Sequence, residues 1–290
     1  MKPISLRYCK PAMAVLAGLI TMASCEKDKD GIVNTPAYLP AAIHFHGLPA
    51  DSFTYNSKQQ LEHLYYDYSS ATGYNAYCVF DYNVAGKCVR VRYYNTNDPV
   101  LADKDTLVYN NQDFTVYTED DDDPFELEDG RAYKVSNDGI LLAGSKDTVR
   151  SSERKRVNYI ETSFNGGNAV STTIVSYLYM AGSNYERSDV STLTYRYDDR
   201  PNGLQLLFRI NPYAGYLMNH HHSDAPLLAG GRNNLAGLTY EIVNTTYTEK
   251  TDYTATNTYD PETGLVTTQV MKSDNRNDDI TISYRYIPLK

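Results

Sequence analysis

The feature that most constrains the fold of this 290-residue chain is the strict alternation of apolar and polar side chains. Over residues 280–286, isoleucine and tyrosine hold the even positions, and threonine, serine and arginine hold the odd ones. Successive side chains of a β-strand point to opposite faces of a sheet, so this pattern indicates a strand with one buried face. The segments 172–177, 193–197 and 238–242 are equally rich in β-branched and aromatic residues. The sequence therefore predicts an all-β chain.

A hairpin unit recurs along the chain: aromatic residues, then Asp or Asn, a few polar residues, often glycine, and an aliphatic strand. Asp and Asn side chains hydrogen-bond the backbone of a turn, glycine accepts the positive φ that closes it, and tyrosines pack across neighbouring strands. Repeated hairpins predict a large antiparallel meander whose twist curls it into a barrel or half-barrel. The copies are 53–56 before Leu61, 80–83 before Val89, 195–198 before Leu204, 259–260 before Leu265, and a weaker one at 133–140.

One segment departs from the strand pattern, because residues 211–235 mix glycine, alanine, proline and a histidine run. Asp224 is suited to cap a short helix, with Pro226 in its first turn and Gly230 near its end. We expect a short helical or irregular insertion near 211–235 that covers an open end of the sheet.

The N-terminus has the pattern of an export signal. Basic residues precede an apolar stretch at 11–23, which is too short to span a bilayer as a stable helix. The stretch ends in Ala23-Ser24-Cys25 and resembles a bacterial lipoprotein signal, in which a lipid such as palmitate is attached to the new N-terminal cysteine. The alternative is an ordinary signal peptide with a chance cysteine. We expect a signal peptide at 1–24, a lipidated Cys25 and flexible tether at 25–42, and one β domain at 43–290.

The combination of these features resembles a known family. The hairpins are similar to the tyrosine-aspartate repeats of large bacterial surface proteins. The chain resembles still more closely a family of uncharacterised Bacteroidetes lipoprotein domains described as porin-like, over about residues 50–290. Its late leucine- and glycine-rich segment is matched here by residues 227–235. The acidic residues after Cys25 also resemble the surface-export tag of such lipoproteins. The resemblance implies a curled antiparallel barrel and assigns no ligand.

Two cysteines, Cys78 and Cys88, fall within the expected β domain. An exported protein can form disulfides, and the two residues are ten apart. A four-residue turn at 83–86 would place Cys88 opposite Asp81 and put the two cysteines on opposite faces of the sheet. This parity favours free thiols, whereas a β-bulge would permit the disulfide.

Histidines supply the candidate metal ligands. Imidazole and carboxylate suit zinc, so His220, His222 and Asp224 form the strongest candidate set. His44 and His46 form a second set if they share a strand face. Ordinary surface residues are the favoured interpretation of both sets, and we predict no metal and no other cofactor.

The tyrosines supply the candidate ligand-binding residues. In the pairs Tyr65-Tyr66 and Tyr93-Tyr94, alternation puts one ring on each face, so one member of each pair lies away from the core. An outward ring can stack on a sugar while its hydroxyl forms hydrogen bonds. Cross-strand packing is the alternative role.

The formal net charge of -9 opposes binding to nucleic acid, and the sequence contains no nucleophile elbow, phosphate-binding loop or CxxC zinc motif. We expect a non-catalytic protein that is lipid-anchored to the outer membrane, displayed on the cell surface or facing the periplasm, and that binds a glycan or an envelope protein. Two alternatives stay open: a lipid or lipoprotein carrier with a half-barrel cavity, and a hydrolase with converging carboxylates or histidines.

Overall fold

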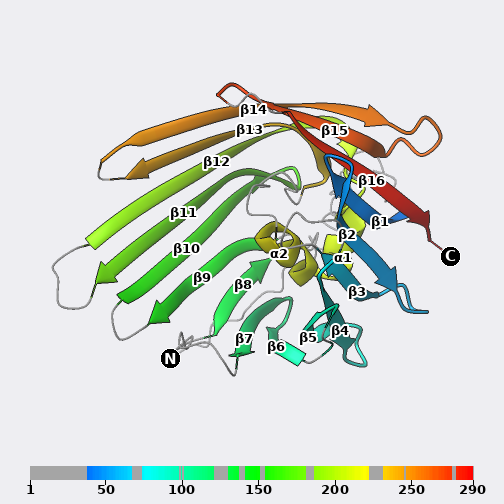
Figure 1. Ribbon diagram of the computed structural model, residues 1–290, viewed down its shortest axis with the longest axis horizontal. Coiled ribbons are helices and arrows are strands. Elements are labelled where there is room, and N and C mark those ends of the chain that lie inside the picture. Colours follow the sequence, from blue (N-terminus) through cyan, green and yellow to red (C-terminus); the bar gives the residue numbers. More distant parts are fainter. Residues whose placement is uncertain are drawn as a thin grey trace, which may run out of the picture. The chain divides into compact units, whose positions relative to one another are not determined.

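The computed structural model divides the chain into two compact units, Met1–Asn34 and Thr35–Lys290, and the described residues all belong to the second unit. These residues form sixteen strands and two helices (Figure 1). The structure describes residues 38–66, 74–97, 99, 101–120, 130–136, 141–150, 154–180, 186–221, 231–244, 246–275 and 279–289.

The elements follow one another as an antiparallel meander with a single helical interruption. Their bounds are β1 Tyr38–Phe45, β2 Leu48–Tyr55, β3 Leu61–Tyr66, β4 Ala76–Tyr82, β5 Cys88–Asn95, β6 Leu101–Asn110, β7 Asp113–Asp120, β8 Arg131–Val135, β9 Leu141–Arg150, β10 Arg154–Asn165, β11 Asn168–Met180, β12 Glu186–Pro201, α1 Gln205–Ile210, α2 Pro212–His221, β13 Asn233–Asn244, β14 Thr248–Tyr259, β15 Val266–Ser273 and β16 Ile280–Pro288.

Strand pairing closes the sheet on itself. Each strand pairs with its sequence neighbours, and β1 pairs with both β2 and β16, so the ladder forms a closed barrel. The predicted all-β antiparallel meander is confirmed. The strand pairing begins at Tyr38, five residues before the boundary expected at position 43. Pro40, which suggested a flexible tether, is buried in β1, where a register shift between Pro40 and Ala42 accommodates it.

Alternation decides which side chains face the interior. In β4, Ala76, Cys78 and Phe80 are buried, whereas the intervening Tyr77 and Val79 are only partly buried. The same rule holds in β16, whose Ile280, Ile282 and Tyr284 join the core cluster. Three outward positions of β14, at 254, 256 and 258, are exposed threonines, and the same face carries Lys250 and Asp252. The outward face of this strand therefore has the polarity of a water-facing surface.

Three of the predicted hairpin turns are stabilised by the same kind of side chain. In each, an Asn or Asp side chain accepts hydrogen bonds from backbone N–H groups further along the turn: Asn56 from Lys58 and Gln60, Asn83 from Ala85 and Lys87, and Asp260 from Glu262 and Thr263. Positive φ angles at Gln59, Gly86 and Gly264 complete these turns.

Of the other two predicted hairpins, one has a different structure and one lies partly outside the described residues. Asp198 lies within β12, and Leu204, predicted to begin a strand, precedes helix α1. Asn202 redirects the chain at this point, because its side chain accepts a hydrogen bond from the Leu204 N–H. In the weaker copy, residues 137–140 lie outside the described residues.

The helical insertion is confirmed, but it begins earlier than predicted. Its two helices span positions 205–221, and Asp224, the predicted cap, lies outside the described residues. Asn211 occupies the N-cap position of α2, where its side chain accepts a hydrogen bond from the Ala214 N–H, and Pro212 takes the first helical position. Neither helix of the described part of the chain is long and apolar enough to span a bilayer.

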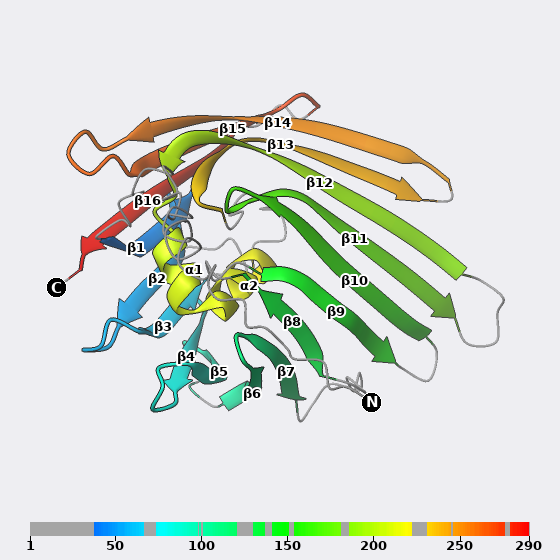
Figure 2. The same ribbon diagram turned by 180° about the vertical axis from the view of Figure 1, so that it is seen from behind.

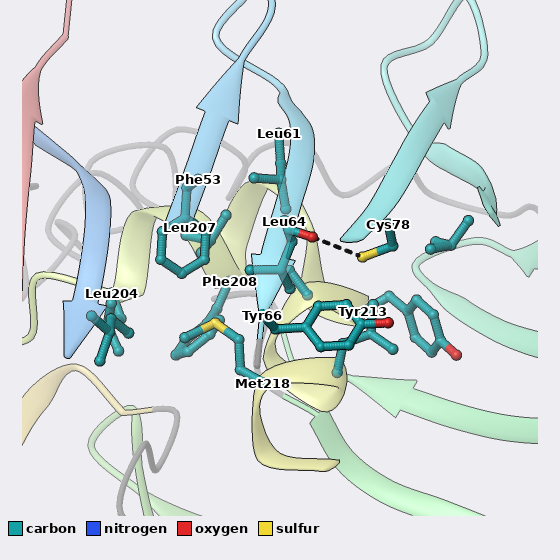
Figure 3. Packing of buried hydrophobic residues seen from close by; sticks show 14 of the residues in the cluster. Phe53, Leu61, Leu64, Tyr66, Cys78, Leu204, Leu207, Phe208, Tyr213 and Met218 are labelled. Carbon is teal, nitrogen blue, oxygen red and sulfur yellow. Dashed lines mark hydrogen bonds between the residues drawn. The ribbon is translucent and has the colours of Figure 1, made fainter. Parts of the chain in front are cut away.

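Both helices lie within the ring of strands (Figures 1 and 2). Leu207, Phe208 and Met218 pack with Leu61 and Leu64 of β3 in one continuous core cluster (Figure 3). Full burial of a side chain of this size contributes about 1.5–3 kcal/mol relative to its exposure. The two helices therefore pack against the inner face of the sheet and share its core.

Candidate functional site

The structure separates the two tyrosine pairs as alternation predicts. Tyr66 is 1% exposed and Tyr93 packs against the core, so both face the interior. Tyr65 and Tyr94 occupy the intervening positions and face outward, and Tyr77 of β4 faces outward between them. We call Tyr65, Tyr77 and Tyr94 the tyrosine row.

The tyrosine row follows directly from strand register. Tyr65 is the Cα partner of Tyr77, which is in turn the partner of Tyr94, so the residues lie side by side on β3, β4 and β5. Their rings stack, with centroids 5.4 Å apart and planes at 29° for Tyr65–Tyr77, and 5.1 Å and 16° for Tyr77–Tyr94. Each outer ring thus covers one face of the Tyr77 ring.

Polar neighbours fix the ends of the tyrosine row. Arg92 donates two hydrogen bonds to Asp81, at 2.8 and 3.1 Å, and a third to the Tyr94 hydroxyl at 3.1 Å. At the other end, the His63 ring stacks on Tyr65 with a centroid separation of 5.8 Å. Within the described residues, the hydroxyls of Tyr65 and Tyr77 have no hydrogen-bond partner.

The tyrosine row lies at the end of the barrel opposite to the start of β1. Tyr65 is near the last residue of β3, Tyr77 near the first of β4, and Tyr94 near the last of β5. Antiparallel pairing brings these strand ends together, and it places Tyr38 at the far end. The sequence pattern alone would have found Tyr77, because positions 76, 78 and 80 are its apolar neighbours on the inward face.

Behind the tyrosine row, the barrel interior contains a buried carboxylate. Asp105 of β6 is 3% exposed, and it accepts hydrogen bonds from the hydroxyls of Tyr93 and Tyr213 at 2.5 Å each and from Thr118 at 2.7 Å. Arg131 of β8 extends the set by donating to Thr118 at 2.8 Å. These hydrogen bonds join α2 to strands β5, β6, β7 and β8.

Tyr216 completes the connection between α2 and β8. Its hydroxyl accepts a hydrogen bond from Arg131 at 2.5 Å, and its ring stacks on Tyr213, with centroids 5.3 Å apart. We call Asp105 and its partners Tyr93, Thr118, Arg131, Tyr213 and Tyr216 the Asp105 network.

Burial keeps the interior hydroxyls and thiols in their neutral forms. It raises the pKa of Tyr93 and of Tyr213 well above the ordinary value of 10.0. Burial also raises the pKa of the Cys88 thiol to about 12 and that of Cys78 well above 9.0. The carboxylate of Asp105 therefore meets hydroxyl donors that stay protonated at neutral pH.

Cys78 and Cys88 are both buried free thiols on the inward face. The parity expected from a four-residue turn was wrong, because the loop contains five residues, 83–87, and the register shifts between Asp81 and Tyr82. Cys88 consequently pairs with Tyr82, four residues from Cys78 and about 13 Å from it along the strand. A disulfide requires Cα atoms within about 7 Å, so this register keeps the thiols apart.

The histidine candidates do not form a site in the described part of the chain. His46 lies in the β1–β2 turn with φ of 50°, so it does not share a strand face with His44 as expected. His220 falls at the end of α2, and its side chain, His222 and Asp224 lie outside the description. No group of three potential metal ligands is present among the described residues. Cys25 and the signal segment also lie outside them.

The chain has distant likenesses among solved structures. No protein-family description matches the chain, and neither does any curated protein. A porin-like protein from Bacteroides uniformis matches 87% of this chain and 97% of its own at 13% identity, with a TM-score of 0.30. A porin-like protein from Bacteroides vulgatus matches 87% of this chain and 100% of its own at 12% identity, with a TM-score of 0.29. A chain of the TcdB2-TccC3-Cdc42 structure matches 79% of this chain and 10% of its own at 11% identity, with a TM-score of 0.33. These scores are too low to carry an argument about function.

Proposed function

We propose that this protein is a non-catalytic, lipid-anchored module of the bacterial cell envelope that binds a glycan or an envelope protein through the tyrosine row. The lipoprotein-like sequence around Cys25 supports the anchor. The observation that carries the binding role is the outward stack of Tyr65, Tyr77 and Tyr94. Tyrosine combines a large apolar ring with a polar tip, which suits it to recognition surfaces.

The contrast with the outward face of β14 strengthens this assignment. On β14 the outward positions 254, 256 and 258 carry threonine, a residue that favours strands without adding a large ring. The outward positions of β3–β5 instead carry three aligned phenols, held at one end by Arg92, which is itself held by Asp81. A fixed, regular set of side chains costs little conformational entropy when it binds a partner.

We propose that the module acts on the cell surface or in the periplasm. The acidic segment after Cys25, which resembles the export tag of surface lipoproteins, supports this location.

The interior favours this proposal over the two alternatives. A lipid carrier needs a dry aliphatic cavity, but the side chains of α1 and α2 occupy the interior beside β1–β8, together with the Asp105 network. A hydrolase needs groups that converge on an accessible substrate. The carboxylate of Asp105 is instead buried and hydrogen-bonded to three hydroxyl groups.

The binding role is tested by replacing the tyrosine row with the residue that β14 carries outward. The triple variant Tyr65→Thr/Tyr77→Thr/Tyr94→Thr keeps strand propensity while it removes the rings. We expect this variant of the full chain to lose binding to envelope fractions of cells that lack the protein. The matched control is Tyr117→Thr, which removes an outward tyrosine of β7 that is 49% exposed. Equal binding by wild type and the triple variant would contradict the proposal.

The anchor is tested separately. Cells that express the wild type are expected to incorporate a palmitate analogue into the protein, and Cys25→Ser is expected to abolish the label. Labelling that persists in Cys25→Ser would overturn the lipid assignment without affecting the binding surface.

A further inference from the structure

The chemistry and spacing of the tyrosine row define the class of ligand that it fits. The row is linear and crosses the strands, with ring centroids separated by 5.4 and 5.1 Å. The sheet sets this spacing, because adjacent strands lie about 4.8 Å apart. A matching ligand must therefore repeat along a line at about this interval.

Both faces of the central ring of the tyrosine row, that of Tyr77, are already occupied. Tyr65 covers one face of Tyr77, and Tyr94 covers the other at an interplanar angle of 16°. A flat aromatic ligand therefore has no place to stack on the central ring. The row offers ring edges and phenol hydroxyls instead, and the hydroxyls of Tyr65 and Tyr77 have no partner within the described residues. The ligand must then supply hydrogen-bonding groups at successive positions.

The closed ladder opposes an extended peptide as that ligand. Peptides commonly join a sheet by pairing with a free strand edge. Here β1 pairs with β16, so the barrel offers no such edge within its described strands. A polysaccharide needs no backbone pairing, and it presents hydroxyls on each successive sugar ring.

Charge favours a neutral polysaccharide over an acidic one. The cation that touches the row, Arg92, already donates two hydrogen bonds to Asp81. It also donates to the Tyr94 hydroxyl, which leaves that hydroxyl's own proton for a ligand acceptor. The formal net charge of -9 adds repulsion toward polyanions.

The end of the row beside β6 adds an apolar contact. Leu101 is the Cα partner of Tyr94 and is 46% exposed. A sugar ring placed there meets the edge of an aromatic ring and an aliphatic side chain, which suit the apolar C–H face of a pyranose.

We propose that the tyrosine row binds a neutral, extended polysaccharide laid across β3, β4 and β5, with successive sugars hydrogen-bonded to the hydroxyls of Tyr94, Tyr77 and Tyr65. This assignment rests on the proposed binding function and names its ligand class. Affinity then increases with the number of sugars until the row is covered.

The test uses the purified full chain and affinity electrophoresis in gels that contain hydroxyethylcellulose, xylan or mannan as neutral extended probes. Polygalacturonate serves as the acidic probe. We expect at least one neutral probe to retard the wild type, and polygalacturonate to leave its mobility unchanged. The triple variant Tyr65→Phe/Tyr77→Phe/Tyr94→Phe keeps the stacked rings and removes only the hydroxyls. We expect it to bind at least about tenfold more weakly, while Tyr117→Phe binds like wild type.

Three results would overturn the ligand class: no retardation by any neutral probe, retardation by polygalacturonate alone, or equal affinity of wild type and the triple phenylalanine variant. Loss of envelope binding in the threonine variant, together with no retardation by the neutral probes, would leave the binding function intact and point to a protein ligand. If the threonine variant still binds the envelope fractions, the proposed binding function itself is contradicted.

Discussion

The two faces of β3–β5 carry the same residue type in different environments. Tyr93 faces inward and donates a hydrogen bond to Asp105, whereas its neighbour Tyr94 faces outward and accepts one from Arg92. The inward tyrosine completes a buried hydrogen-bond network. The outward tyrosine belongs to the stacked tyrosine row. Adjacent positions in the sequence thus serve the interior and the surface separately.

The carboxylates of the same region show the same contrast. Asp105 is 3% exposed and accepts hydrogen bonds from three hydroxyl groups. Its loss would leave these hydroxyls without their acceptor. Asp81 pairs with Arg92 on the outward face, where the side chains of Arg92 and Asp81 are 33% and 39% exposed. Water can replace the partner of an exposed group but cannot replace that of a buried one. The interior contacts should therefore dominate stability.

The largest expected effect is alkaline unfolding through the interior tyrosines. In the unfolded chain these tyrosines ionise near pH 10, whereas burial raises the folded-state pKa of Tyr93, Tyr213 and Tyr286 well above 10.0. The stability that they confer is thus fully present below pH 10 and is lost as the pH rises from 10 toward their folded-state pKa. We expect part of the tyrosinate absorbance to appear only together with the loss of circular dichroism. Complete tyrosine ionisation in a still-folded barrel would contradict the proposed difference between the inward and outward tyrosines.

The next largest effect is expected from Asp105→Ala. Three hydroxyl groups lose a buried acceptor, so we expect the free energy of unfolding to fall by about 3–5 kcal/mol in urea denaturation. The matched outward change, Asp81→Ala, is expected to lower it by at most about 1 kcal/mol. Equal losses in the two variants would show that the inward and outward faces do not differ as the burial of these carboxylates implies.

The smallest effect separates two neighbouring hydroxyls. Tyr93→Phe removes a hydrogen bond to the buried Asp105 side chain and is expected to lower the free energy of unfolding by about 1–3 kcal/mol. Tyr94→Phe leaves a solvent-accessible arginine and is expected to change it by no more than about 0.5 kcal/mol. Thermal or urea unfolding of the two single variants measures this difference. A larger loss from Tyr94→Phe would assign the tyrosine row a structural role instead.

Local patterns predicted most of the fold. Alternation identified the inward faces, and the Asn or Asp of three hairpins supplied the predicted turns at positions 56, 83 and 260. The helix predicted with Asp224 as its cap lies outside the described residues, whereas the start of α2 at Asn211 and Pro212 was not predicted. The β4–β5 loop has one residue more than predicted, and a register shift follows between Asp81 and Tyr82, so Cys88 faces inward. A register shift of this kind depends on how the strands pair, and the residue pattern of the loop does not specify it.

The sequence by itself determined which tyrosines share a face, because the period of two in a strand is a local property of the backbone. Only the tertiary structure decided what each face meets. Pairing of β1 with β16 joins residues far apart in the chain and closes the barrel, and the folding of α2 into its interior brings Tyr213 to Asp105. Register between three strands aligned Tyr65, Tyr77 and Tyr94 into a stack. Contacts of this kind depend on long-range pairing, whose free energy is gained only when the whole ladder forms.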